Sequence, residues 1–172
     1  MYKLLASSQT LLRLLCYMPK NQNDNPLDPD KKDIKDLPNR DKLIAKSLVV
    51  GDKTDKLMLE EKICRLCMYT GTREIGKTQV AGVNQLIKNP RWSTQYYVFD
   101  IYVHMSANTI DFRADWIGEE LNRVLFSQDI EEFSDIEVSA GMPIQKTPEG
   151  YVGYRWVYHF TSAQEPKGRV DR

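Results

Sequence analysis

The chain lacks an excess of charge of either sign, because its 172 residues carry 24 Lys and Arg against 24 Asp and Glu. A protein that coats nucleic acid or a membrane surface generally shows a basic excess. The balance therefore argues against both as a general activity and leaves room only for a local basic patch. It also leaves little self-repulsion, which suits a subunit that packs against copies of itself.

Long apolar runs are missing as well, and none approaches the roughly 20 residues of a membrane span. The leucine-rich start is interrupted by Ser7, Ser8 and Arg13 and is followed by a poor cleavage site. We therefore expect an amphipathic helix over residues 1–18 and no signal peptide.

Cysteine and histidine are scarce, with three and two residues. Cys16, Cys64 and Cys67 are an odd number, which favours free thiols. Cys64 and Cys67 would point to opposite faces of a strand and could not bind one metal together. His104 and His159 fall on the less apolar faces of expected strands, so we interpret them as surface or interface residues. We expect no enzyme activity, no metal and no cofactor.

Alternation is the clearest pattern present. Residues 95–105 alternate with a period of two, which predicts a strand. A helical apolar stripe follows, and Asn108 or Thr109 is the expected cap of one helix of four to five turns. The apolar face of the strand consists of Tyr97, Phe99, Ile101, Val103 and Met105, and the helical stripe of Ile110, Ala114, Ile117, Leu121, Val124 and Leu125.

Three further strands complete the expected fold. Residues 63–70 are predicted to form one strand. Apolar and polar residues alternate over 136–145 and 152–160, on either side of the turn Thr147–Gly150, which predicts an antiparallel hairpin. Pro143 lacks a backbone donor, so its strand should be an edge or bulged. We expect an α+β fold with a small, mostly antiparallel sheet, the order α-β-β-α-β-β and helices on one face.

The expected organisation is a single domain over residues 1–172. The prolines and many Asn, Asp and Lys residues after the first helix predict a long loop or an arm that orders on a partner. The parts are therefore an N-terminal helix (1–18), a polar insert or arm (19–60), an α+β core (61–162) and a loose tail (163–172).

Residues Gly71–Thr78 match the P-loop pattern G-x-x-x-x-G-K-[ST], in which Lys77 would contact phosphates and Thr78 a magnesium ion. Asp100 could pass for the second magnesium ligand. The surroundings favour another interpretation, because a P-loop strand is a buried aliphatic run of a parallel sheet, whereas Arg65 lies in the middle of this one. The sequence predicts that the segment links two adjacent antiparallel strands, and a small NTP-binding protein is the alternative.

Residues 63–73, 97–104 and 111–126, with the order of elements, resemble the tail-terminator and neck proteins of tailed bacteriophages. The resemblance implies a virion protein without catalytic residues, assembled in the host cytoplasm as a homo-oligomeric ring, typically a hexamer. Its partners would be its own copies, the tail tube and the head connector, with DNA only passing through the lumen. The loop at 71–94 would contact neighbours, and the expected interface residues are Arg73, Lys77, Arg91, Trp92 and Tyr96. A bacterial protein-binding module outside any phage is a further alternative.

Overall fold

The computed structural model describes residues 1–52, 54, 57, 62–79, 86–127 and 136–163, with 77–79, 86–92 and 161–163 as backbone only. Outside the described residues lie the expected tail apart from residue 163, residues 53, 55–56 and 58–60 of the expected insert, and residues 61, 80–85 and 128–135 of the expected core. The helices are α1 (Tyr2–Ser7), α2 (Gln9–Cys16), the 3-10 helix η1 (Ile34–Asp36), α3 (Arg40–Ser47), α4 (Met105–Asp111) and α5 (Arg113–Phe126). The strands are β1 (Leu48–Val50), β2 (Cys64–Gln79), β3 (Leu86–His104), β4 (Ile136–Pro143) and β5 (Tyr151–Ala163).

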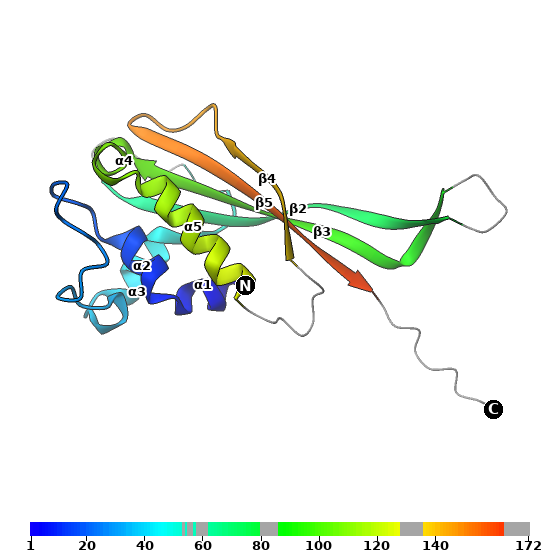
Figure 1. Ribbon diagram of the computed structural model, residues 1–172, viewed down its shortest axis with the longest axis horizontal. Coiled ribbons are helices and arrows are strands. Elements are labelled where there is room, and N and C mark those ends of the chain that lie inside the picture. Colours follow the sequence, from blue (N-terminus) through cyan, green and yellow to red (C-terminus); the bar gives the residue numbers. More distant parts are fainter. Residues whose placement is uncertain (53, 55–56, 58–61, 80–85, 128–135, 164–172) are drawn as a thin grey trace.

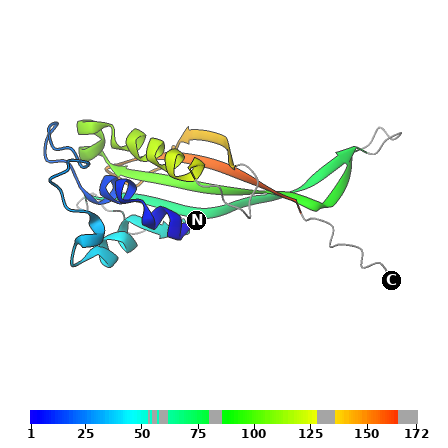
Figure 2. The same ribbon diagram turned by 60° about the horizontal axis from the view of Figure 1, so that its bottom comes forward.

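The strands form one sheet in the order β1-β2-β3-β5-β4, and helices cover one of its faces (Figures 1 and 2). The predicted α+β class and the antiparallel pairing of the four longer strands are confirmed. The short strand β1 pairs parallel with β2, which makes the sheet mixed and adds a strand to the expected order. Strand β4 is the edge and carries a register shift between Val138 and Ala140, as Pro143 led us to expect.

The main core lies between the sheet and the helices. Leucines of α1 and α2, the stripe of α5 and alternate residues of β2, β3 and β5 share this layer. Phe99, Ile101 and Val103 are fully buried there, as the alternation predicts. Met105 is not part of this face, because it begins α4 and is 49% exposed.

The prediction of a single helix after β3 is wrong, because the chain forms two helices, α4 and α5, that meet at Phe112. Phe112 has φ 52° and so adopts the left-handed conformation, which interrupts the helix. Asn108 still caps a helix, since its Oδ1 accepts a bond of 2.9 Å from the backbone N–H of Ala114 in α5. His104 is buried rather than exposed, and its Nδ1 accepts from Ser106 N at 3.2 Å as the cap of α4.

The two cysteines of the C-x-x-C pair lie on opposite faces of β2, as predicted. Cys64 packs into the main core, and Cys67 packs into a smaller cluster with Leu57, Tyr102 and Tyr151 on the other face. Burial raises the pKa of the Cys64 thiol to about 12, so this thiol stays protonated near neutral pH.

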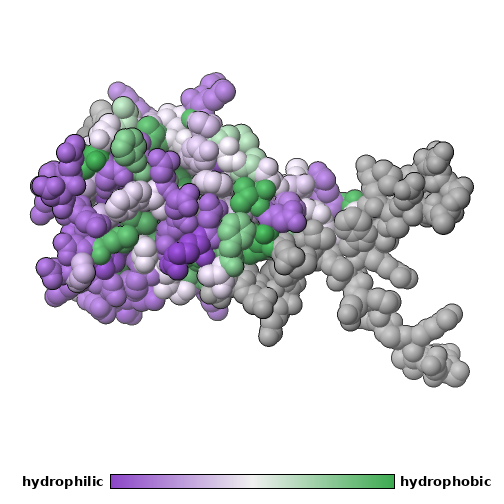
Figure 3. Space-filling model, in the orientation of Figure 1, coloured by the Kyte–Doolittle hydropathy of each residue, from purple (hydrophilic) through white to green (hydrophobic). Residues whose placement is uncertain are grey.

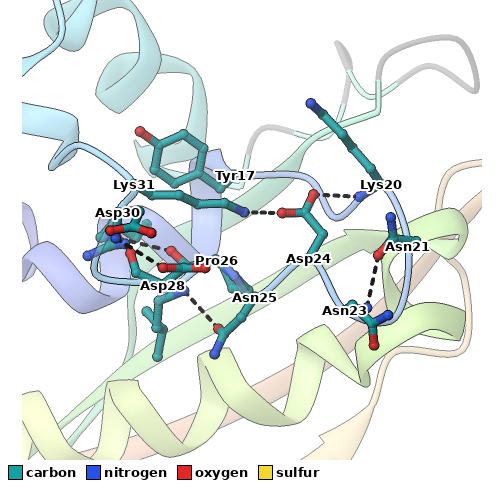
Figure 4. A network of polar contacts seen from close by, with 12 residues as sticks. Tyr17, Lys20, Asn21, Asn23, Asp24, Asn25, Pro26, Asp28, Asp30 and Lys31 are labelled. Carbon is teal, nitrogen blue, oxygen red and sulfur yellow. Dashed lines mark hydrogen bonds and ion pairs between the residues drawn. The ribbon is translucent and has the colours of Figure 1, made fainter.

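Residues 19–52 fold against the chain's own helices, so of the two alternatives predicted after the first helix, a long loop and an arm, the structure does not show the arm. The Arg13 guanidinium of α2 donates to the carbonyls of Pro26 and Asp28, and the Tyr17 hydroxyl donates to Lys32 O at 2.7 Å. Figure 4 shows how this segment satisfies its own backbone: side chains of Asn21, Asn25 and Asp28 each accept from the N–H two residues further on. These turns order a segment that is poor in apolar residues.

Ser8 links the N-terminal helices to α5. Its hydroxyl oxygen accepts from Leu11 N at 3.2 Å as the N-cap of α2 and donates to the buried Glu120 at 2.9 Å. We expect Ser8→Ala to lower the free energy of unfolding by about 1–2 kcal/mol, the loss of a cap and of a bond to a charged group. Urea denaturation measures this, with Ser7→Ala as the control, because the Ser7 hydroxyl bonds only to Leu4 O at an exposed site. Equal effects of the two substitutions would contradict the linking role.

Candidate interface: the projecting hairpin

Strands β2 and β3 continue past the helices as a two-stranded hairpin that projects from one end of the molecule (Figures 1 and 2). The two strands are antiparallel, which confirms the arrangement predicted for the segment before and after residue 77. We expected a polar link over 71–94, but β2 runs to Gln79 and β3 begins at Leu86. We name residues 71–79 and 86–95 the distal hairpin; at its inner end, residues 92–95 also pair with β5, and its outer part is two-stranded.

Two irregularities bend the distal hairpin. Between the pairs Thr70↔Tyr97 and Arg73↔Gln95, β2 has one residue more than β3, and Gly71 lies there. A Cβ at Gly71 would lie 3.2 Å from the Cβ of Tyr96, so a larger residue would push the strands apart. Between the pairs Ile75↔Ser93 and Lys77↔Lys88, β3 carries the extra residues, which include Pro90. Proline has no N–H to pair and is accommodated where a ladder is interrupted.

The P-loop interpretation fails on this geometry. A P-loop wraps phosphates with backbone N–H groups and opens a helix at its Lys-Ser/Thr end. Here all eight residues from Gly71 to Thr78 lie in β2, and the strand continues to Gln79. Asp100 is also engaged elsewhere, because both of its carboxylate oxygens accept from Arg155.

All five interface residues expected from the sequence lie on β2 or β3. Arg73 is exposed, and its Nε and Nη2 both donate to Ser93 Oγ, at 3.1 and 2.9 Å. The half-buried Tyr96 ring lies 5.7 Å from the ring of His159. For Lys77, Arg91 and Trp92 the structure describes only the backbone position. In the strand register, Lys77 lies opposite Lys88, and Trp92 lies opposite Ala163 of β5.

The distal hairpin combines basic and apolar character. It carries Arg73, Lys77, Lys88 and Arg91 against the single acid Glu74. The Ile75 side chain on it is 50% exposed. A second exposed apolar area lies on the body beside the root of the hairpin, where α5 ends next to β4 (Figure 3). The exposed large apolar side chains of these two elements include Phe126, Val138 and Met142, at 40–51%. Apolar groups rimmed by charge are typical of protein contact surfaces.

A buried ion pair holds the root of the hairpin on the face of the sheet opposite the helices. Arg155 of β5 donates to Asp100 of β3 through Nε at 2.6 Å and Nη2 at 2.7 Å, a bidentate pair. The Tyr69 hydroxyl of β2 donates to Asp100 at 2.9 Å and accepts from Arg155 at 2.9 Å. Burial and the neighbouring carboxylate raise the pKa of Tyr69, so it remains a donor. Sequence analysis missed this network, although an aspartate in the middle of a strand is a signal of it.

His159 lies in a polar cluster with two residues of the edge strand, which sequence analysis also missed. The Ser139 hydroxyl lies 2.8 Å from His159 Nδ1, and Glu137 Oε2 lies 3.2 Å from Nε2. The Glu137 side chain is 68% exposed. In hydrolase triads the carboxylate contacts Nδ1 and the serine contacts Nε2, which is the reverse of this order. The cluster serves to join β4 to β5.

Within the described ranges, no three His, Cys, Asp or Glu side chains gather as metal ligands would. Across the same residues, no helix has the length and apolar content needed to span a bilayer.

Comparison with known proteins points to one family. A family model described as YomW matches residues 8–160. The SPbeta prophage-derived protein YomW of Bacillus subtilis (strain 168) is 25% identical over 175 residues, which cover 95% of this chain and 94% of that protein.

Proposed function

Because this chain belongs to the YomW family, which includes a prophage-derived protein of Bacillus, we propose that it is a structural protein of a tailed phage. In this proposal it is one subunit of a homo-oligomeric ring at the neck of the virion, of six copies by resemblance. The ring would close the tail tube and join it to the proteins of the head connector, and DNA would only pass through its lumen. It would act as a building block and not as an enzyme.

The observation that carries the proposal is the distal hairpin. A two-stranded ribbon that leaves its own core is marginally stable in water unless it packs on something else. The large buried side chains of the main core lie outside it, so the hairpin contributes little to the fold of its own chain. Its exposed side chains of Ile75 and Arg73 are therefore available to another molecule. A contact between the hairpin of one copy and a different surface of the next is heterologous, and such contacts form a ring when the rotation from copy to copy closes.

The test is a chain whose hairpin is shortened. Residues 75–93 are replaced by Asn-Gly, which lets Glu74 and Thr94, a pair in the native register, flank a two-residue turn. We expect this variant to fold, with circular dichroism and a cooperative melt like those of the full chain, because the main core is untouched. It should not enter phage particles when it replaces the full chain in the lysogen that carries the gene.

Mass spectrometry of purified particles and electron microscopy of their necks measure the outcome. We expect the full chain in the particles, and tails without an attached head when only the shortened chain is present. Absence of the full chain from intact particles would overturn the proposal and favour a protein-binding module outside the virion.

A further inference from the structure

We propose that the distal hairpin of one copy docks on the outer face of helix α5 of the next copy, an inference that rests on the ring proposed above. The occupant of the α5 face is therefore a second copy of this chain. Charge, exposure and the position of the hairpin carry the inference.

Charge is distributed unevenly in this neutral chain. The distal hairpin has four basic residues and one acidic residue. Residues 111–127, which begin with the end of α4 and include α5, have four acidic and two basic residues. Net charges of +3 and −2 on two segments of one neutral protein make an attractive pair when the segments meet.

The acidic side chains that are free to take part lie on α5. Asp111 is bonded to Arg113, and the buried Glu120 is bonded to Ser8 and Arg123. The side chains of Asp115 and Glu119 are exposed and make no hydrogen bond or ion pair with any residue that the structure describes. They are four residues apart and so lie on one face of the helix.

Apolar side chains accompany the two carboxylates. Trp116 is 40% exposed, and Phe112, at the start of α5, is 67% exposed. The outer face of α5 is thus acidic and aromatic, and the distal hairpin is basic with an exposed Ile75. Aromatic anchors beside charged pairs are typical of the parts of an interface that contribute most to binding.

One copy cannot satisfy this match alone. The distal hairpin points away from the end of the sheet on which the helices pack, and in both views its outer part projects away from α5 (Figures 1 and 2). The match is therefore made between copies, each offering its hairpin to one neighbour and its α5 to the other. Nucleic acid is a different partner for a basic ribbon, but it would leave Ile75 and the acidic face of α5 without a role.

Charge reversal tests the contact. Arg73→Glu with Lys77→Glu reverses the hairpin, and Asp115→Lys with Glu119→Lys reverses the helix. Sedimentation velocity of the full chain measures self-association. We expect each reversed variant alone to associate on the order of 10- to 100-fold more weakly, because like charges then face each other. A matched control, Lys32→Glu with Lys42→Glu, changes exposed charges elsewhere and should associate like the wild type.

Mixing the two reversed variants in equal amounts gives the sharpest outcome. In an alternating assembly, each acidic hairpin meets a basic helix and each basic hairpin meets an acidic helix. Association should therefore return to within about threefold of wild type, and it should weaken as salt rises from about 50 to 500 mM, as screening requires. Thermal melts of each variant confirm that it is folded.

Three results would overturn the docking. The first is a wild-type protein that stays monomeric at all concentrations. The second is that the charge-reversed variants associate as strongly as the wild type. The third is duplex DNA that binds wild type and is lost on hairpin reversal with no change in association, which would assign the hairpin to nucleic acid. These three results test only the contact between hairpin and helix. The proposed function is tested separately, by the presence of the protein in phage particles.

Discussion

Arg155→Met is expected to lower the free energy of unfolding by about 3–5 kcal/mol, the range for removing one partner of a buried ion pair. Asp100 is fully buried, and without the guanidinium its carboxylate would keep only the Tyr69 hydroxyl as a donor. Neutralising the other partner of the pair, by Asp100→Asn, should lower the free energy of unfolding less, by about 2–3 kcal/mol. The Arg155 side chain is 36% exposed, so water can solvate the cation that remains.

A double-mutant cycle with urea denaturation measures both effects. The double variant Asp100→Asn with Arg155→Met should be more stable than Arg155→Met alone, since no uncompensated charge is then buried. Tyr69→Phe is the control within the network, with an expected cost of about 1 kcal/mol, because Asp100 keeps its bidentate partner. If Arg155→Met lowered the free energy of unfolding no more than Asp100→Asn, an unpaired Asp100 carboxylate would not be the cause of the predicted loss.

This network also has a consequence for the hairpin. Tyr69, Asp100 and Arg155 come from β2, β3 and β5, the three strands that meet where the distal hairpin leaves the body. When the ion pair is broken, amide exchange in β2 and β3 near residues 69 and 100 should become faster. Assembly should also weaken, because the distal hairpin would no longer be held in one orientation relative to the rest of the sheet.

Periodicity alone was enough to predict the parts of the fold that have one apolar face. The strand that contains Phe99 and Ile101 and the stripe of α5 follow from alternation and helical spacing, and the edge position of β4 follows from the missing N–H of Pro143. The break at Phe112 did not follow, because a left-handed residue is usually a glycine or an asparagine and no such signal stands there.

The segment 19–52 and the hairpin root could not be predicted for a different reason. Composition counts apolar residues, whereas the turns at Asn21, Asn25 and Asp28 are held by polar side chains that bond to nearby backbone. The pairing of Asp100 with Arg155 depends on the register of β3 with β5, which is set by contacts across the sheet. The distal hairpin was predicted to be a link because one expected strand ended at residue 70 and the next began at residue 95. The structure uses Gly71 and Pro90 at irregular positions of long strands.

Arg113→Ala is expected to lower the free energy of unfolding by about 3–5 kcal/mol, the largest effect for any single residue of α5. The Arg113 side chain is fully buried between α5 and the end of α2. Its Nη1 donates to Leu14 O at 2.7 Å and Tyr17 O at 2.6 Å, and its Nε and Nη2 donate to Asp111. It thereby satisfies carbonyls that the end of a helix leaves without partners. Removing it would leave these acceptors and a buried carboxylate unpaired, next to a cavity.

A loss of this size is a large part of the stability of a domain, typically 5–15 kcal/mol, so Arg113→Lys is the variant that keeps the measurement possible. It retains the charge but has no planar fork to reach three acceptors at once, and we expect an intermediate cost of about 2–3 kcal/mol. Arg123→Ala is the matched control on the same helix, since Arg123 also binds a carboxylate but its side chain is 62% exposed. It should cost about 1–2 kcal/mol, because the buried Glu120 keeps the Ser8 hydroxyl as a donor. If Arg113 and Arg123 gave similar changes in the urea midpoint, α2 would not depend on the buried guanidinium, and the attachment of the N-terminal helices to α5 would have to come from the leucines of α2 alone.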